Sequence, residues 1–158
     1  MLSLFAIVWC WNAGIAKALS YNWSITDQSP LITYTPLVLG DNTTTWSSSY
    51  SLSSGNNYEL AGYASLIGEG RSSHTSEAPG ATAKIGFAGT AVYVWGETYQ
   101  LSAVISVDGV SRGFSPGQTG VIGSVTNLSN AWHEVQVLVR GLAGVQIYGF
   151  TFTSELKG

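Results

Sequence analysis

The sequence is poor in cysteine, and its 158 residues include one, Cys10. Cys10 lies in an apolar run, residues 4–11, that is followed by small residues at Ala16 and Ala18. This pattern predicts a secretory signal at residues 1–18, since the run is too short for a membrane span, which takes about 20 residues. Cleavage after Ala18 would leave a single domain, residues 19–158, without a disulfide. A domain of that size can be held by its hydrophobic core alone.

Charge is also scarce, at 9% of the residues. Without residues 1–18, five basic and nine acidic residues remain, a net charge of −4. The basic residues are scattered, whereas binding a phosphate backbone needs clustered cations, so nucleic acid is excluded as a partner. Solubility must come from hydroxyls, amides and sugar chains. Sequons at Asn22, Asn42 and Asn127 predict N-glycosylation and fit a secreted, extracellular protein at a cell wall or surface.

Signals for the start or end of a helix are missing between residues 81 and 152. Residues 81–87 and 133–139 alternate small or apolar with polar side chains, the period of a strand with one buried face. Asp108-Gly109, between two β-prone runs, predicts a hairpin with a type I′ turn. In the second strand His133, Val135, Val137 and Val139 should point into the core, with Glu134, Gln136 and Arg140 on the other side.

Turn residues separate further β-prone runs, and the whole pattern predicts an all-β antiparallel sandwich. No internal repeat or linker divides it. The additional strands are expected at residues 23–26, 31–34, 46–49, 72–76, 91–95, 102–107, 110–114, 121–125 and 145–152.

A family likeness follows from the order of these segments. Residues 82–96 (TAKIGFAGTAVYVWG), 105–109 (ISVDG), 128–137 (LSNAWHEVQV) and the closing 145–153 together resemble the galactose-binding-like jelly-roll ectodomains of fungal secreted and single-pass surface proteins. The resemblance implies an antiparallel sandwich of about eight strands, as in many carbohydrate-binding modules. It implies little about the ligand, because this fold hosts many functions.

Two motifs that suggest catalysis fail on chemical grounds. Residues 113–117 match the G-x-S-x-G nucleophile elbow, but the residue after the serine is Pro116, which has no N–H for an oxyanion hole. His133-Glu134 begins like a zinc-binding H-E-x-x-H motif, but the fifth position is Val137 on a strand. His133 and His74 are instead expected to be partly buried and to donate a ring nitrogen to a backbone carbonyl. No metal or cofactor is indicated.

Carboxylates for glycoside hydrolysis are nominally available at Glu97, Asp108 and Glu134. The presence of Asp108 is explained by the predicted turn, and that of Glu134 by its position on the polar face of its strand. Hydrolysis is therefore the least favoured function from the sequence, and no enzyme is predicted.

Aromatic side chains remain as the candidate binding groups. Tyr58, Tyr63, Tyr99 and Trp132 fall in predicted loops or at strand ends, where an exposed ring can stack on the apolar face of a sugar; each is equally explained as a packing anchor of its loop. The leading hypothesis is a secreted, non-catalytic module that binds polysaccharide or glycoprotein glycans weakly. The alternative is a structural or adhesive glycosylated ectodomain without a sugar site.

Overall fold

The structure, a computed structural model, describes residues 19–36, 45–52, 70–98, 102–112, 119–141 and 143–156. Within these ranges every regular element is a strand, so no described helix is long and apolar enough to cross a membrane. The strands are β1 (Leu19–Thr26), β2 (Thr33–Thr35), β3 (Ser47–Leu52), β4 (Gly70–Ser76), β5 (Thr82–Gly89), β6 (Ala91–Thr98), β7 (Ala103–Val107), β8 (Val110–Arg112), β9 (Thr119–Val125), β10 (Ala131–Val139) and β11 (Val145–Leu156).

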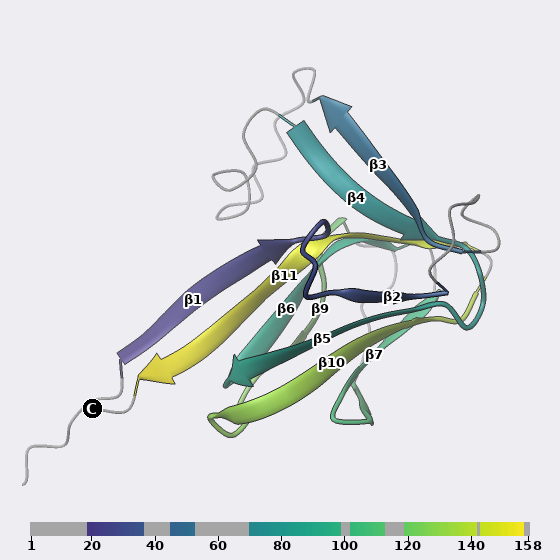
Figure 1. The fold of residues 1–158 in the computed structure, drawn as a ribbon. Helices are drawn as coiled ribbons and strands as arrows, with labels where there is room; N and C mark the ends of the chain where they lie inside the picture. The colour runs from purple at the N-terminus through teal and green to yellow at the C-terminus, as the bar shows by residue number, and fades with distance from the viewer. Residues whose placement is uncertain are drawn as a thin grey trace, which may run out of the picture.

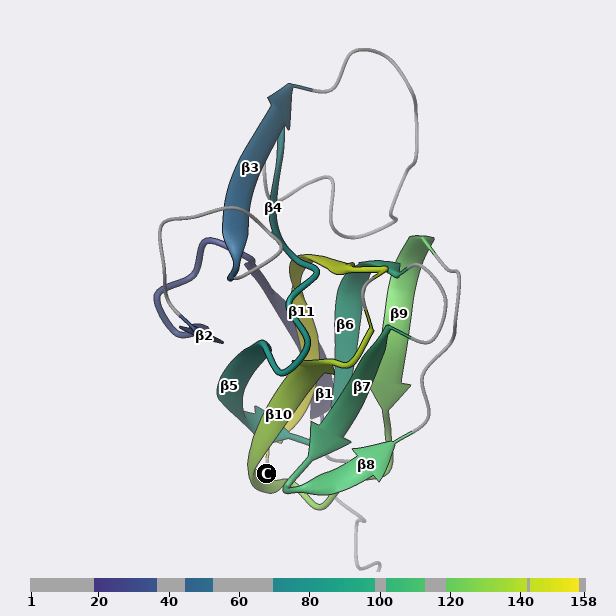
Figure 2. The ribbon, with the colours of Figure 1, turned by 90° about the vertical axis from the view of Figure 1, so that its right-hand side faces the viewer.

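Two antiparallel sheets face one another (Figure 1). One sheet has the order β3-β4-β11-β6-β9, with β1 also paired to β11, and the other has the order β2-β5-β10-β7-β8. Figure 2 shows β3 and β4 projecting past the end of the sandwich. The all-β antiparallel sandwich is thus confirmed, and it is consistent with a galactose-binding-like fold. Each of the eleven β-prone runs contains or overlaps a strand, so the estimate of about eight, taken from the resemblance, is low.

The hydrophobic core lies between the sheets and follows the predicted alternation. On β10 the residues His133, Val135, Val137 and Val139 are buried, while Glu134 and Arg140 are exposed and Gln136 is partly exposed. Phenylalanines from both sheets fill the centre, with the rings of Phe87 and Phe152 stacked at 4.7 Å. Asp108 and Gly109 have φ of 52° and 76°, so the predicted turn with two positive φ angles is present between β7 and β8.

Candidate functional site

The candidate site lies where β1 and β4 meet end to end on the same edge of β11. Thr26, the last residue of β1, pairs with Gly149, and His74 of β4 pairs with Ile147. A bulge in β11 separates these two positions, and the carbonyl of its residue Tyr148 accepts a hydrogen bond from Asp27 N at 2.9 Å. The bulge therefore fixes Asp27, the residue that follows β1, beside the side chains of β4.

Asp27 is fully buried, and its carboxylate is the centre of a hydrogen-bond network. Ser72 Oγ donates to one carboxylate oxygen. His74 Nδ1 lies 2.8 Å, and Gln28 Nε2 2.9 Å, from the other. A buried carboxylate is tolerated only when such partners compensate its lost hydration, so these contacts are needed for the fold itself.

His74 is held in one orientation by contacts on two sides. Its ring stacks on Tyr34, with the centroids 4.1 Å apart and an interplanar angle of 11°, and the Tyr34 hydroxyl donates to the Asp27 carbonyl at 3.0 Å. The His74 side chain keeps 17% of its surface exposed. Because Nδ1 donates its proton to Asp27, the neutral ring carries its lone pair on Nε2, which has no hydrogen-bond partner among the described residues. This is the arrangement of a general base with an orienting carboxylate.

Two further groups adjoin this pair. Ser48 of β3 is exposed and lies directly opposite His74 in the β3–β4 register, which places both side chains on one face. Trp46 is buried against Tyr34 at 5.1 Å, and its indole N–H has no acceptor within the described chain. A buried donor without a partner costs about 1–3 kcal/mol.

A second Asp–His pair, between Asp108 and His133, has the opposite character. His133 is buried; Nδ1 lies 2.7 Å from the Asp108 carboxylate and Nε2 lies 2.8 Å from the Ser129 carbonyl. Burial lowers the pKa of His133, but the hydrogen bonds to Ser129 and Asp108 outweigh it and raise the pKa above 6.5. Hydrogen bonds from His133 and the Glu134 N–H lower the pKa of Asp108 below 3.8. With both nitrogens committed, this histidine ties the β7–β8 turn to β10.

The histidine predictions are therefore partly right. His133 does donate to a backbone carbonyl, as expected, and also contacts a carboxylate. The contact of His74 with Asp27, 47 positions away in the sequence, was missed. Asp27 had no distinguishing signal, because Asp27-Gln28-Ser29-Pro30 has the composition of an ordinary turn.

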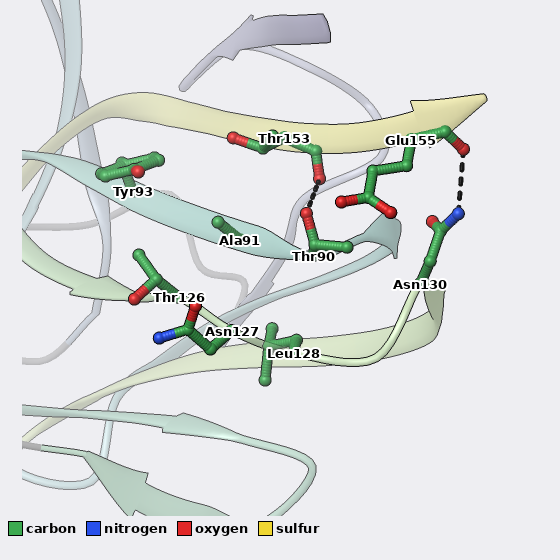
Figure 3. A pocket seen from close by; sticks show the side chains of 9 residues that line it. All are labelled: Thr90, Ala91, Tyr93, Thr126, Asn127, Leu128, Asn130, Thr153 and Glu155. Atoms are coloured by element: carbon green, nitrogen blue, oxygen red, sulfur yellow. Dashed lines mark hydrogen bonds between the residues drawn. The ribbon is translucent and has the colours of Figure 1, made fainter. Parts of the chain in front are cut away.

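A polar hollow of about 360 Å³ lies near the other end of β11 (Figure 3). Its walls include Tyr93, Asn127 and Glu155, and the Asn130 side chain donates to the Glu155 carbonyl at 2.9 Å. Among the described residues that line it, Glu155 is the one with a carboxylate, whereas glycoside hydrolysis uses a pair of them.

The three carboxylates considered for glycoside hydrolysis each have another partner. Glu97 accepts a hydrogen bond from the Tyr148 hydroxyl at 2.6 Å, Asp108 binds His133, and Glu134 lies 3.5 Å from Lys84 Nζ. Glu97 is in one sheet and Glu134 in the other. No cluster of three or more metal-ligating His, Cys, Asp or Glu side chains occurs in the described ranges.

Of the predicted aromatic binding residues, Trp132 lies at the start of β10 and is 72% exposed. Tyr58, Tyr63 and Tyr99 lie outside the described residues, as does the segment 113–117. Among the predicted glycosylation sites, Asn22 and Asn127 are exposed and Asn42 falls outside the described ranges. The Asn22 side-chain oxygen accepts a hydrogen bond from Thr153, which leaves its amide nitrogen accessible.

Comparison with known proteins gives similarity at the level of structure. No family model and no curated protein sequence matches the chain. A solved structure of a family two carbohydrate esterase from Cellvibrio japonicus is similar with a TM-score of 0.53 at 16% identity, over 89% of this chain and 36% of that one. A two-domain esterase active on acetylated mannans has a TM-score of 0.48 at 12% identity, over 87% of this chain and 37% of that one. This chain thus spans little more than a third of either esterase.

These likenesses correct the function expected from the sequence. A non-catalytic glycan-binding module was favoured, with a structural or adhesive ectodomain as the alternative. The solved structure with the TM-score of 0.53 is a carbohydrate esterase, so the comparison points to a hydrolase-related fold instead of a non-catalytic module. Short motifs could not reveal the Asp27–His74 contact, because Asp27 follows β1 and His74 lies on β4, 47 positions further along the chain.

Proposed function

We propose that this domain takes part in the hydrolysis of an acyl ester on a carbohydrate, with His74 as the general base and Asp27 as the carboxylate that orients it. One observation carries the proposal: a fully buried carboxylate binds His74 Nδ1 at 2.8 Å, while the second ring nitrogen is unbonded within the described chain. Structural histidines such as His133 use both nitrogens.

The likeness to the Cellvibrio japonicus carbohydrate esterase supports the choice of reaction. That similarity concerns the fold, and this chain spans 36% of that esterase, so the activity rests on the site in hand. The partly exposed His74 lies on β4, which projects with β3 past the end of the sandwich (Figure 2), and this position suits a substrate as large as a sugar polymer.

The proposed reaction is a general-base hydrolysis. His74 Nε2 takes a proton from water as the water oxygen attacks the ester carbonyl carbon. The bond from that carbon to the sugar oxygen then breaks, and the proton on Nε2 passes to the sugar oxygen. The products are the free sugar hydroxyl and the carboxylic acid, which ionises in solution.

Assays on 4-nitrophenyl acetate and on an acetylated polysaccharide, with release of acetate as the readout, test the proposal. His74→Gln should lower kcat by about 10²-fold or more, the usual contribution of a general base. His133→Gln is the matched control and should keep the rate, because His133 is fully hydrogen-bonded away from the site. Ser48→Ala should also keep most of the rate if water is the nucleophile. Equal rates for wild type and His74→Gln would reject the proposal.

We also propose that the chain is an extracellular protein of the fungal secreted or cell-surface type that it resembles. The apolar run at residues 4–11, the small residues at 16 and 18, and the exposed sequons at Asn22 and Asn127 support this. Expression in a eukaryotic secretory host should yield a protein cleaved after Ala18 that loses mass on enzymatic deglycosylation. Intact mass spectrometry reads out both, and a secreted product that retains Cys10 would contradict the cleavage.

A further inference from the structure

The outward face of β5 and β10 carries one large exposed ring among small and polar side chains. Trp132 is 72% exposed on this face, because its position in β10 has the opposite phase to the buried His133 and Val135. It pairs with Ala88, and two residues further along each strand Gly86 pairs with Glu134. An exposed tryptophan without a structural role in its sheet is uncommon, since so large an apolar ring is normally at least partly covered.

The indole of Trp132 packs in the space that the missing side chain of Gly86 leaves free. A Cβ added to Gly86 would lie 2.3 Å from Cζ2 of the indole and about 3.0 Å from the two atoms bonded to it. The benzo edge of the indole therefore occupies the space above Gly86. Only a glycine at this position allows the ring to pack so closely against the strand. A ring held in this way loses little conformational entropy when a ligand stacks on it.

The charged side chains next to the Trp132–Gly86 contact, Lys84 and Glu134, sum to no net charge. Lys84 Nζ and Glu134 Oε1 lie 3.5 Å apart, with 41% and 57% of their side chains exposed, so the two charges compensate. Gln136 pairs with Lys84 on one side and with Ser106 of β7 on the other, and both Gln136 and Ser106 are partly exposed. A flat neutral surface with amide, hydroxyl and paired charged groups beside one apolar ring matches an uncharged ligand with many hydroxyls and an apolar face.

From this geometry we infer that the outward face of β5 and β10 binds a neutral polysaccharide, with Trp132 stacking on the C–H face of one sugar ring and Glu134, Lys84 and Gln136 hydrogen-bonding its hydroxyls. The inference deepens the proposed function, on which its biological role rests, by naming a polymer as the carrier of the ester. The Trp132 surface lies on the opposite sheet from His74 and would hold the chain of sugars while another part of it reaches the imidazole.

A protein partner fits this face less well. A stable protein interface buries about 800 Å² per partner around several apolar anchors. Trp132 alone buries at most about 250 Å², and the residues that flank it on the same face are Ala88, Gly86 and Glu134, with the partly exposed Leu138 and Val104 farther along the strands. A single ring flanked by hydroxyl-binding groups is enough for a sugar, provided that the polymer offers repeated contacts.

Retention on insoluble mannan, cellulose, β-1,3-glucan and chitin tests the inference, with polymers that carry no ester so that hydrolysis plays no part. Wild type should be retained on at least one polymer, and Trp132→Ala should weaken retention about tenfold or more. Tyr21→Ala, which removes another exposed ring, on β1, is the matched control and should bind as wild type does. His74→Gln should also bind normally, which separates a failure of this surface from a failure of the proposed reaction.

Gly86→Ala gives a sharper test, because it keeps the Trp132 side chain but fills the space in which the indole packs. The three atoms nearest to the added methyl all belong to the movable Trp132 side chain, so the domain should keep its wild-type urea midpoint while retention falls toward that of Trp132→Ala. The double variant Gly86→Ala/Trp132→Ala should bind no worse than Trp132→Ala alone, since both changes act through one ring. Absence of wild-type retention on all four polymers, or unchanged retention in Trp132→Ala, would overturn the inference.

Discussion

The two Asp–His pairs of this sandwich consist of the same residue types but differ in burial and in hydrogen bonding. In the Asp27–His74 pair the carboxylate is fully buried and the imidazole is partly exposed, with one ring nitrogen bound. In the Asp108–His133 pair the carboxylate is half exposed and the imidazole is buried, with both ring nitrogens bound. The buried carboxylate of Asp27 thus leaves one ring nitrogen of its histidine without a hydrogen-bond partner among the described residues, as the proposed base requires. The buried His133, with both ring nitrogens hydrogen-bonded, holds the β7–β8 turn against β10, and we call this pair the Asp108–His133 lock.

The difference follows from where each pair lies in the fold. Asp108 is in a two-residue turn that follows β7, so its carboxylate stays in water while it reaches His133 on the neighbouring strand β10. Asp27 is instead drawn into the gap between two strands that share one edge of β11, where the bulge at Tyr148 binds its backbone N–H. Turns place charged groups at the rim of a sandwich, whereas a break in strand pairing can bury one.

The largest expected contrast between the pairs is in stability. Asp27→Asn keeps the side-chain volume but places an amide N–H against donors from Ser72 or His74, and should lower the free energy of unfolding by about 3 kcal/mol. Asp108→Asn alters a half-exposed group that water can hydrate, and it keeps a residue that tolerates positive φ, so its loss should be smaller. Urea unfolding at pH 7 compares the two. Equal losses would mean that the burial of Asp27 has no energetic weight.

The fold of this domain was largely predictable from sequence, and the reason is local. The alternation in residues 133–139 and the Asp108-Gly109 turn are set by neighbours along the chain, and both are present as expected. The His74 site was not predictable, because it depends on a register shift in β11 that brings together residues 47 positions apart. Trp132 could be selected as a strand-end aromatic, but the space that Gly86 leaves for its indole depends on cross-strand pairing.

The pH dependence of stability should identify the Asp108–His133 lock. His133 has a raised pKa, so its contribution is fully present below about pH 6.5 and is lost as the pH rises through its folded-state pKa. Asp108 has a lowered pKa, so its contribution is present above about pH 3.8 and is lost as the pH falls through its folded-state pKa. The pair therefore stabilises the fold most between these two values.

The measurement is the urea midpoint of wild type and His133→Gln across that range. Their difference should be largest near about pH 5 and should shrink at alkaline pH, where wild-type His133 is neutral as well. A difference that widens steadily from pH 5 to alkaline pH would contradict the charged state assigned to His133.

The smallest effect is expected at Gln28, and it measures how open the Asp27 site is. Gln28 is exposed and donates to the same carboxylate oxygen as His74, so in Gln28→Ala water should replace it at a cost below about 1 kcal/mol. Ser72→Ala removes a buried donor that water cannot replace, and should cost about 1–3 kcal/mol. Urea midpoints rank the two variants, and the proposed ester hydrolysis should keep its rate in Gln28→Ala because Nδ1 of His74 keeps its partner. If Gln28→Ala costs as much as Ser72→Ala, water does not reach the carboxylate from that side, and the Asp27–His74 pair is as closed as the Asp108–His133 lock.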